Sequence, residues 1–146
     1  MTGLWVALAT LALGAAIGVV RLRTDGRVGD GEPGPLLGPG ELGAELGERA
    51  TLVQFSTAFC QPCRATRRVL ADVSALVPGV AHVEIDAESR LDLVRRLDVM
   101  RTPTVFVLDA RGAVVRRASG QPTKAAVLHS LAQVVSRDSS HKPDDM

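Results

Sequence analysis

Aromatic residues, cysteines and excess charge are all scarce in this chain of 146 residues. Phe and Trp account for 3% of it and Tyr is absent, so platforms on which nucleic-acid bases could stack are not expected. The 17 basic and 16 acidic residues give a net charge of +1, which supplies no electrostatic footprint for nucleic acid. The 2 cysteines cannot build a disulfide scaffold, so the fold must rest on a hydrophobic core.

Long apolar runs are also absent, except at the start of the chain. Residues 3–20, GLWVALATLALGAAIGVV, are apolar on every side of a helix, which would extend about 27 Å and match the hydrocarbon layer of a bilayer. A secretory signal peptide would have a basic start and a small-x-small cleavage site, and this run has neither. We therefore predict a transmembrane anchor over residues 1–23 that contacts the lipid bilayer through residues 3–20.

Basic residues stand on one side of this run only. Arg21, Arg23 and Arg27 follow it, and no basic side chain precedes it. The positive-inside bias then predicts a single-pass protein of the cell membrane with its C-terminal domain in the cytoplasm. The alternative is an extracytoplasmic domain.

Composition divides the rest of the chain into three parts. Residues 24–40 are rich in Gly and Pro and predict a linker that holds a domain clear of the membrane. Residues 41–137 have the periodic apolar pattern of a folded domain, and the polar residues 138–146 predict a disordered tail.

Within the domain, helical and strand patterns alternate. Strands are predicted over residues 51–56, 80–86, 104–109 and 113–118, and the last two form a hairpin around Gly112. Strands separated by helices predict parallel pairing, and the hairpin adds an antiparallel section. The expected fold class is α/β, a mixed sheet with helices on both faces. The expected apolar helix positions are Leu42 and Leu46; Val69, Leu70, Val73, Leu76 and Val77; Leu91, Val94 and Leu97; and Val127, Leu128, Leu131 and Val135.

Both cysteines lie in TLVQFSTAFCQPCRAT, where Cys60 and Cys63 are separated by Gln61 and Pro62. Tetrahedral zinc needs four ligands, and no second paired-ligand motif accompanies this one, so no metal site is predicted. A structural disulfide across so short a loop would stabilise little through chain entropy. Two inert buried thiols would not explain a polar, proline-containing start of a helix.

Redox chemistry explains this spacing best. At the start of a helix, exposed amide groups and the helix dipole stabilise a thiolate at Cys60, which can attack a substrate disulfide. Cys63, one turn later, can then attack Cys60 and release the reduced substrate. Pro62 fits because the first helical turn needs no amide donor there.

The segment FSTAFCQPCRATRRVL, followed forty residues later by RTPTVFVLDARG, resembles the thioredoxin family over about residues 42–135. The resemblance implies the thioredoxin fold, with a cis peptide bond before Pro103 beside the two sulfurs. It also implies that the backbone of Thr102 binds the substrate chain. Further substrate contacts are expected from Phe59, Gln61 and Pro62, around the cysteines.

Three positions depart from the family pattern. Phe59 replaces the usual Trp before the first cysteine, which keeps an apolar surface and loses the indole donor. Gln54 takes the place of the buried Asp that assists proton transfer, and His82 that of its Lys partner. A neutral Gln cannot act as a base, whereas a His titrates near neutral pH. Because Gln54 and His82 occupy the positions of the family's proton-handling pair, both are candidates for proton handling.

These observations predict a thiol-disulfide oxidoreductase with Cys60 as nucleophile and Cys63 as resolving thiol. The expected partners are protein disulfide or thiol substrates and an electron-donating reductase or other redox partner; the resemblance implies no bound cofactor. The alternative is a binding or delivery module of the same fold, whose soft thiolates hold a copper ion at a membrane partner.

Overall fold

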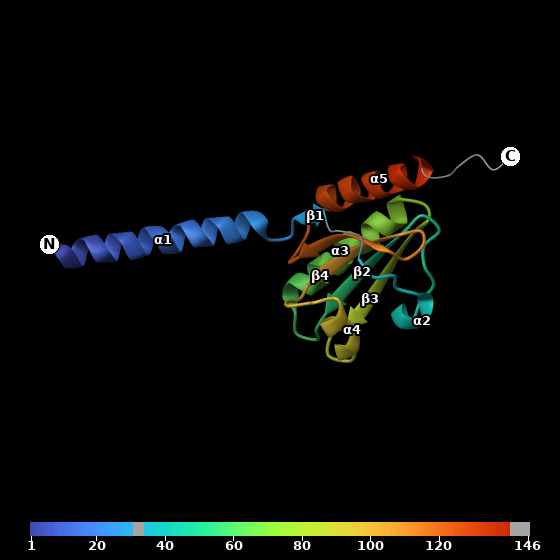
Figure 1. Cartoon of the computed structure of the whole chain (residues 1–146), viewed down its shortest axis with the longest axis horizontal. Coiled ribbons are helices and arrows are strands. Elements are labelled where there is room, and N and C mark those ends of the chain that lie inside the picture. The colour runs from blue at the N-terminus through green and yellow to red at the C-terminus, as the bar shows by residue number, and fades with distance from the viewer. Residues whose placement is uncertain (31–33, 141–146) are drawn as a thin grey trace.

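A long helix, α1, leads into a five-stranded sheet with helices on both faces in the computed structural model of the chain (Figure 1). The structure describes residues 1–30 and 34–140. The elements are α1 (Thr2–Thr24), β1 (Val28–Asp30), α2 (Pro39–Leu42), β2 (Ala50–Ser56), α3 (Gln61–Leu76), β3 (Val80–Asp86), α4 (Leu91–Arg96), β4 (Thr104–Asp109), β5 (Val114–Ser119) and α5 (Lys124–Ser140).

The strand order β1-β5-β4-β2-β3 makes the sheet mixed. β2 and β3 are parallel and joined by α3, whereas β4 runs antiparallel to both β2 and β5. The β4–β5 turn includes Gly112, whose φ is 89°. Glycine adopts this positive φ without the steric strain that a side chain would cause. The predicted fold class, a thioredoxin fold with a mixed sheet, is confirmed.

Strand alternation divides the interior into two cores, one on each face of the sheet. Phe55 of β2 and Phe106 of β4 point to the α2 and α4 face, where their rings meet edge to face with centroids 5.7 Å apart. Leu52 of β2 and Val107 of β4 point to the opposite face, against α3 and α5. The sheet is therefore buried on both faces, and residues of the strands can reach a binding partner only at the strand ends.

Some of the predicted helix positions are wrong. Leu76 at the end of α3 and Leu91 at the start of α4 are exposed, and Leu93 takes the place of Leu91 in the core. The helix expected around Leu42 and Leu46 is a single turn, because Gly43 adopts a left-handed conformation (φ 70°) and ends it.

The prediction of a linker over residues 24–40 is wrong for much of that segment. β1 is itself an edge strand of the sheet and pairs with β5, with Gly29 opposite Arg117. Leu37 is 1% exposed in the α2–α4 core, and Leu36 forms a bridge to Ala113. Residues 28–30 and 34–37 are hydrogen-bonded along β5 and the turn before it, and only residues 25–27 separate α1 from the domain's first strand.

The C-terminal boundary also differs from its prediction. Helix α5 continues through Ser140, so residues 138–140 extend the last helix rather than begin a tail. The remainder of the predicted tail, residues 141–146, lies outside the described residues.

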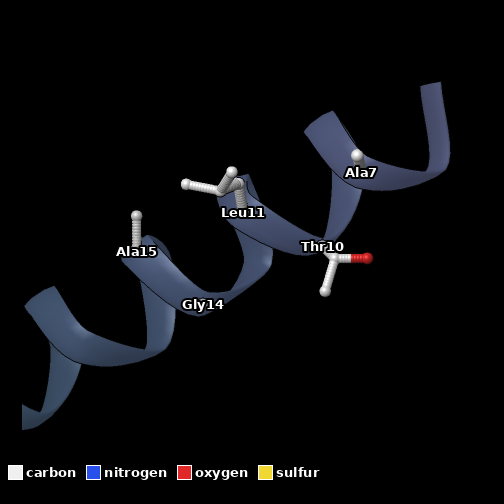
Figure 2. Close-up of a pocket in the computed structure, with 5 residues that line it drawn as sticks. All are labelled: Ala7, Thr10, Leu11, Gly14 and Ala15. Atoms are coloured by element: carbon white, nitrogen blue, oxygen red, sulfur yellow. The ribbon is translucent and has the colours of Figure 1, made fainter. Parts of the chain in front are cut away.

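Helix α1 projects away from the domain (Figure 1) and contributes no buried residue to it. Its mean hydropathy of 2.1 and its length are sufficient to cross a membrane, and it is the only such helix among the described residues. One stretch of its surface forms a shallow hollow lined by Ala7, Thr10, Leu11, Gly14 and Ala15, of which Ala7, Leu11 and Ala15 point to the same side of the helix (Figure 2).

Candidate active site

The two cysteines lie where β2 passes into α3. Cys60 is the N-cap residue of α3 and is half-buried, whereas Cys63, in the first turn, is 1% exposed. The two form a disulfide with their Cα atoms 5.2 Å apart. The backbone N–H of Cys63 donates to Cys60 Sγ at 3.2 Å, so the amide groups at the start of α3 point at that sulfur.

Pro103 stands at the start of the neighbouring strand, β4. It is buried, and the Thr102–Pro103 peptide bond is cis, as the resemblance implies. The Thr102 and Thr57 hydroxyls lie 3.4 Å apart, and Thr57 directly follows β2. This contact joins the loop that carries Pro103 to the loop that carries Cys60.

The remaining predicted substrate-binding residues surround the disulfide on the surface. Phe59 is 98% exposed and directly precedes Cys60. Gln61 and Pro62, in the first turn of α3, are also exposed. The structure thus brings Phe59, Gln61 and Pro62 together beside the cysteine pair, with a ring and an amide free to contact a bound chain.

Gln54 lies behind the pair and is fully buried. Its Nε2 donates a hydrogen bond of 2.8 Å to the carbonyl oxygen of Cys63, while its Oε1 has no partner among the described residues. A neutral amide can make this bond without the cost of burying a charge. Gln54 therefore positions the backbone of Cys63 and has no means of accepting a proton as a base.

His82 Nε2 and Gln54 Oε1 do not form a hydrogen bond with each other. The β2–β3 register sets His82 opposite Leu52, whereas the residue opposite Gln54 is Glu84. His82 Nε2 is buried without a hydrogen-bond partner among the described residues. Burial lowers the pKa of His82 below its ordinary value, and Arg67 lowers it further, while Glu84 opposes the shift.

A polar cluster that the sequence pattern did not predict lies beside Cys60. Glu84 accepts hydrogen bonds from the Ser56 hydroxyl at 2.9 Å and from the Arg67 guanidinium, with one N–H···O contact of 2.6 Å. The hydrogen bond from Arg67 lowers the pKa of Glu84, with a smaller contribution from Ser56. A cavity of about 160 Å³ lies between this cluster and the disulfide, lined by Ser56, Thr57, Ala58, Cys60, Arg64, Arg67, Glu84 and Asp86.

A sequence signal for this cluster exists. Glu84 is the one carboxylate between Val80 and Ile85, and parallel pairing with β2 brings it beside the strand that leads to Cys60. Locating it required the register, which the sequence alone does not supply. No group of three or more His, Cys, Asp or Glu side chains in residues 1–30 and 34–140 is arranged to hold a metal ion.

A family model of thioredoxins matches residues 43–133. The chain is 30% identical over 90 residues to a thioredoxin of Mycolicibacterium smegmatis, covering 60% of this chain and 80% of that one. It is 36% identical over 65 residues to Thioredoxin H5 of Oryza sativa subsp. japonica, covering 44% of this chain and about half (47%) of the rice protein.

A solved structure of chloroplastic thioredoxin z superposes with a TM-score of 0.58 at 20% identity, over 73% of this chain and 97% of that one, which shows a shared fold. The family match covers more than half of the chain and includes the cysteine pair and the cis proline. The chain belongs to the thioredoxin family.

Proposed function

We propose that the chain is a membrane-anchored thiol-disulfide oxidoreductase that exchanges disulfides with protein substrates. The observation that carries this proposal is the Cys60–Cys63 disulfide at the start of α3, next to the loop of cis-Pro103. One sulfur is accessible from solvent and the other is enclosed. This asymmetry is what a two-step exchange needs.

In the reducing direction, the protein starts as a dithiol. The Cys60 thiolate attacks one sulfur of the substrate disulfide, forming a mixed disulfide and expelling the other substrate sulfur as a thiolate. Cys63 loses its proton and its thiolate attacks Cys60 Sγ, which releases the second substrate thiolate. The substrate gains two electrons and two protons, and the protein ends as the Cys60–Cys63 disulfide seen in the structure.

The N-terminus of α3 favours Cys60 as the nucleophile. The Cys63 amide that donates to Cys60 Sγ would stabilise negative charge on the same atom after reduction, and the helix dipole acts in the same sense. The half-exposed position leaves that sulfur open to an incoming disulfide.

The substrate chain would lie across the surface that surrounds Cys60. The backbone of Thr102 is the proposed pairing partner, and Phe59, Gln61 and Pro62 would contact the residues that flank the substrate disulfide. Return to the dithiol requires a partner that donates two electrons, a reductase or another dithiol protein, and no bound cofactor takes part.

The Cys63 thiol must lose its proton before it can attack Cys60. Gln54 holds the Cys63 backbone in place but cannot remove the thiol proton. His82 is the candidate for that task, because a neutral imidazole can accept a proton. Burial lowers its pKa, so it would accept the proton less readily than an exposed His.

The anchor is assigned to α1, whose apolar surface finds no cover in the domain. Arg21 and Arg23 in its last turn, with Arg27 beyond, favour a cytoplasmic domain by the positive-inside bias. The alternative is an extracytoplasmic domain. A membrane-impermeant thiol reagent, applied to intact cells after reduction, would label Cys60 only if the domain lies outside.

The activity is tested by the reduction of insulin disulfides with a chemical electron donor, using the full chain in detergent. We expect turnover by the wild type and none above background by the doubly substituted Cys60→Ser, Cys63→Ser protein. A substitution of the surface residue Arg137, Arg137→Gln, serves as a matched control and should leave turnover unchanged. Equal turnover by the wild type and the double variant would refute the proposal.

A further inference from the structure

The junction between α1 and the domain is tied directly to the loop of cis-Pro103. Asp25, the residue after α1, forms an ion pair with Arg101, two residues before Pro103. The N–H of Gly26 donates to the carbonyl oxygen of Ser119 at 2.8 Å. These two contacts leave no free chain between the end of the anchor and the site.

Close packing makes this connection specific. A Cβ on Gly120 would overlap the Asp25 carboxylate, and a Cβ on Gly26 would overlap the backbone carbonyl of Gln121. The N–H of Gly120 in turn donates to the carbonyl oxygen of Pro103 at 2.7 Å. Anchor, junction, turn after β5 and cis-proline loop therefore form one continuous set of contacts.

The sheet topology places the cysteines at the same end. Phe55 near the end of β2 pairs with Thr104 at the start of β4, and Thr104 pairs with Ser119 at the end of β5. β1 enters alongside at this end, with Val28 opposite Ala118. In Figure 1 the anchor accordingly approaches the domain at the end of the sheet where α3 begins.

The depth of this end follows from the helix rise. If the hydrocarbon layer ends at Val20, the four residues to Thr24 extend about 6 Å further along the helix. The headgroup layer of one leaflet is about 5–7 Å thick. Asp25 then lies at the outer boundary of the headgroups, and the cis-proline loop lies against it.

Exposed apolar side chains support the same placement. Phe59, at 98%, and Met100, at 81%, are the most exposed large apolar side chains of the described part of the domain. Phe59 directly precedes Cys60, and Met100 precedes Arg101 in the cis-proline loop. Large apolar side chains beside a membrane anchor are stable in the interfacial layer, where water is partly excluded.

We propose that the substrates are disulfides in the juxtamembrane segments of membrane-anchored proteins, presented at the headgroup layer of the same leaflet. This proposal rests on the proposed thiol exchange and anchor, and it specifies their substrate class. Confinement to one surface raises the effective concentration of such a disulfide at Cys60. A disulfide carried far from the bilayer meets a site that the junction keeps at the membrane less often, and its reduction is correspondingly slower. The exchange is the two-electron reaction described above.

The test uses the pre-reduced full chain in lipid nanodiscs, in a single turnover that needs no added reductant. Two model substrates share one transmembrane helix and one disulfide-closed loop. In one the loop directly follows the helix, and in the other roughly 40 Gly/Ser residues intervene, a root-mean-square span of about 35 Å. The loop alone, as a soluble peptide, is the third substrate. Substrate thiols are counted by mass spectrometry.

One protein variant releases the domain from the bilayer. It carries roughly 20 Gly/Ser residues between Thr24 and Asp25, about 25 Å of flexible chain, and keeps the Asp25–Arg101 contact and β1 pairing. The matched control carries the same insert after Ser140, away from the junction.

For the wild type and the matched control, we expect the near loop to be reduced about tenfold faster than the distant loop. The junction insert should bring the two rates within about twofold of each other. In a separate assay in detergent, where no bilayer restricts access, all three proteins should reduce the soluble peptide at the same rate. Equal rates for near and distant loops with the wild type, or a ratio that the junction insert leaves unchanged, would overturn the inference alone. Failure of every protein to reduce the soluble peptide would overturn the proposed function with it.

Discussion

Cys60 and Cys63 are joined by a disulfide, yet their surroundings differ in solvent exposure and in the charge of their neighbours. Cys60 is half-buried and borders a polar cavity that Arg64, Arg67 and Glu84 also line. Cys63 is 1% exposed, and its backbone carbonyl is bonded to the neutral Gln54. The Cys60 sulfur is therefore accessible and close to charged side chains, whereas the Cys63 sulfur is enclosed and has no charged partner among the described residues.

This difference separates the two steps of exchange. The attack on substrate depends on a thiolate at Cys60, which the start of α3 and the nearby cations can stabilise. The resolving step depends on Cys63, where no carboxylate stands ready to take the proton. The first step is thus tuned by the cavity and the second by Gln54 and its buried neighbours, so the two can be perturbed separately.

The largest expected effect is in the reactivity of the two thiols after reduction. Iodoacetamide should modify Cys60 about 100-fold faster than Cys63 at neutral pH, because only Cys60 is both accessible and stabilised as a thiolate. Peptide mass spectrometry of partly alkylated protein measures both rates in one sample. Comparable rates, or faster modification of Cys63, would remove the asymmetry.

Gln54→Glu tests the enclosed side. Burial raises the pKa of a carboxyl, and once ionised the carboxylate cannot donate to the Cys63 carbonyl, so we expect a loss of about 2–3 kcal/mol of stability at pH 8. Protonation restores a donor, so the loss should shrink towards pH 5. Denaturant unfolding measures it. Gln54→Leu is the control, because it removes the donor without adding a titrating group and should cost the same at both pH values.

Glu84→Gln tests the open side. Loss of the negative charge that lines the cavity should lower the pKa of the reduced Cys60 thiol by about half a unit. Arg67→Gln removes a positive charge from the same cavity and should raise that pKa by a similar amount. The pH dependence of alkylation reports both values. Shifts in the same direction for both variants would show that charge in the cavity does not act on Cys60.

The smallest effect concerns His82. Its pKa is lowered in the folded protein chiefly by burial, so the unfolded chain binds a proton more readily as pH falls through its ordinary value of 6.5. The wild type should therefore lose stability from pH 7.5 to 5.5, by less than about 1 kcal/mol, and His82→Gln should not. Glu84, with a lowered pKa, loses its contribution only below its ordinary value of 4.5, outside this range. Parallel stability curves would contradict the assignment.

The chemistry of the pair was predictable because it is encoded locally. The spacing of Cys60 and Cys63, the strand before them and the helix after them are read from adjacent residues, and alternation within the strands predicts both cores. The predicted burial of Leu76 and Leu91 is wrong, because both lie at helix ends that extend beyond the core, and periodicity alone does not show where a helix leaves the core.

The connection between anchor and domain was not predictable in this way. A Gly- and Pro-rich segment has the composition of a linker whether or not it packs, and β1 is defined by pairing with β5, roughly ninety residues later in the chain. The Asp25–Arg101 ion pair and the contact between Glu84 and Arg67 likewise depend on tertiary structure. Sequence patterns predicted the elements, and only the register and packing located their partners.

The roles of the two cysteines, Cys60 as attacking thiol and Cys63 as resolving thiol, can be separated in one experiment. Each reduced single variant is mixed with a disulfide-bonded peptide, and the covalent adduct is measured by mass spectrometry. Cys63→Ser should accumulate a stable mixed disulfide through Cys60, because nothing remains to resolve it, whereas Cys60→Ser should form almost none. Accumulation through Cys63 in Cys60→Ser, with none in Cys63→Ser, would reverse the assigned roles and contradict the account.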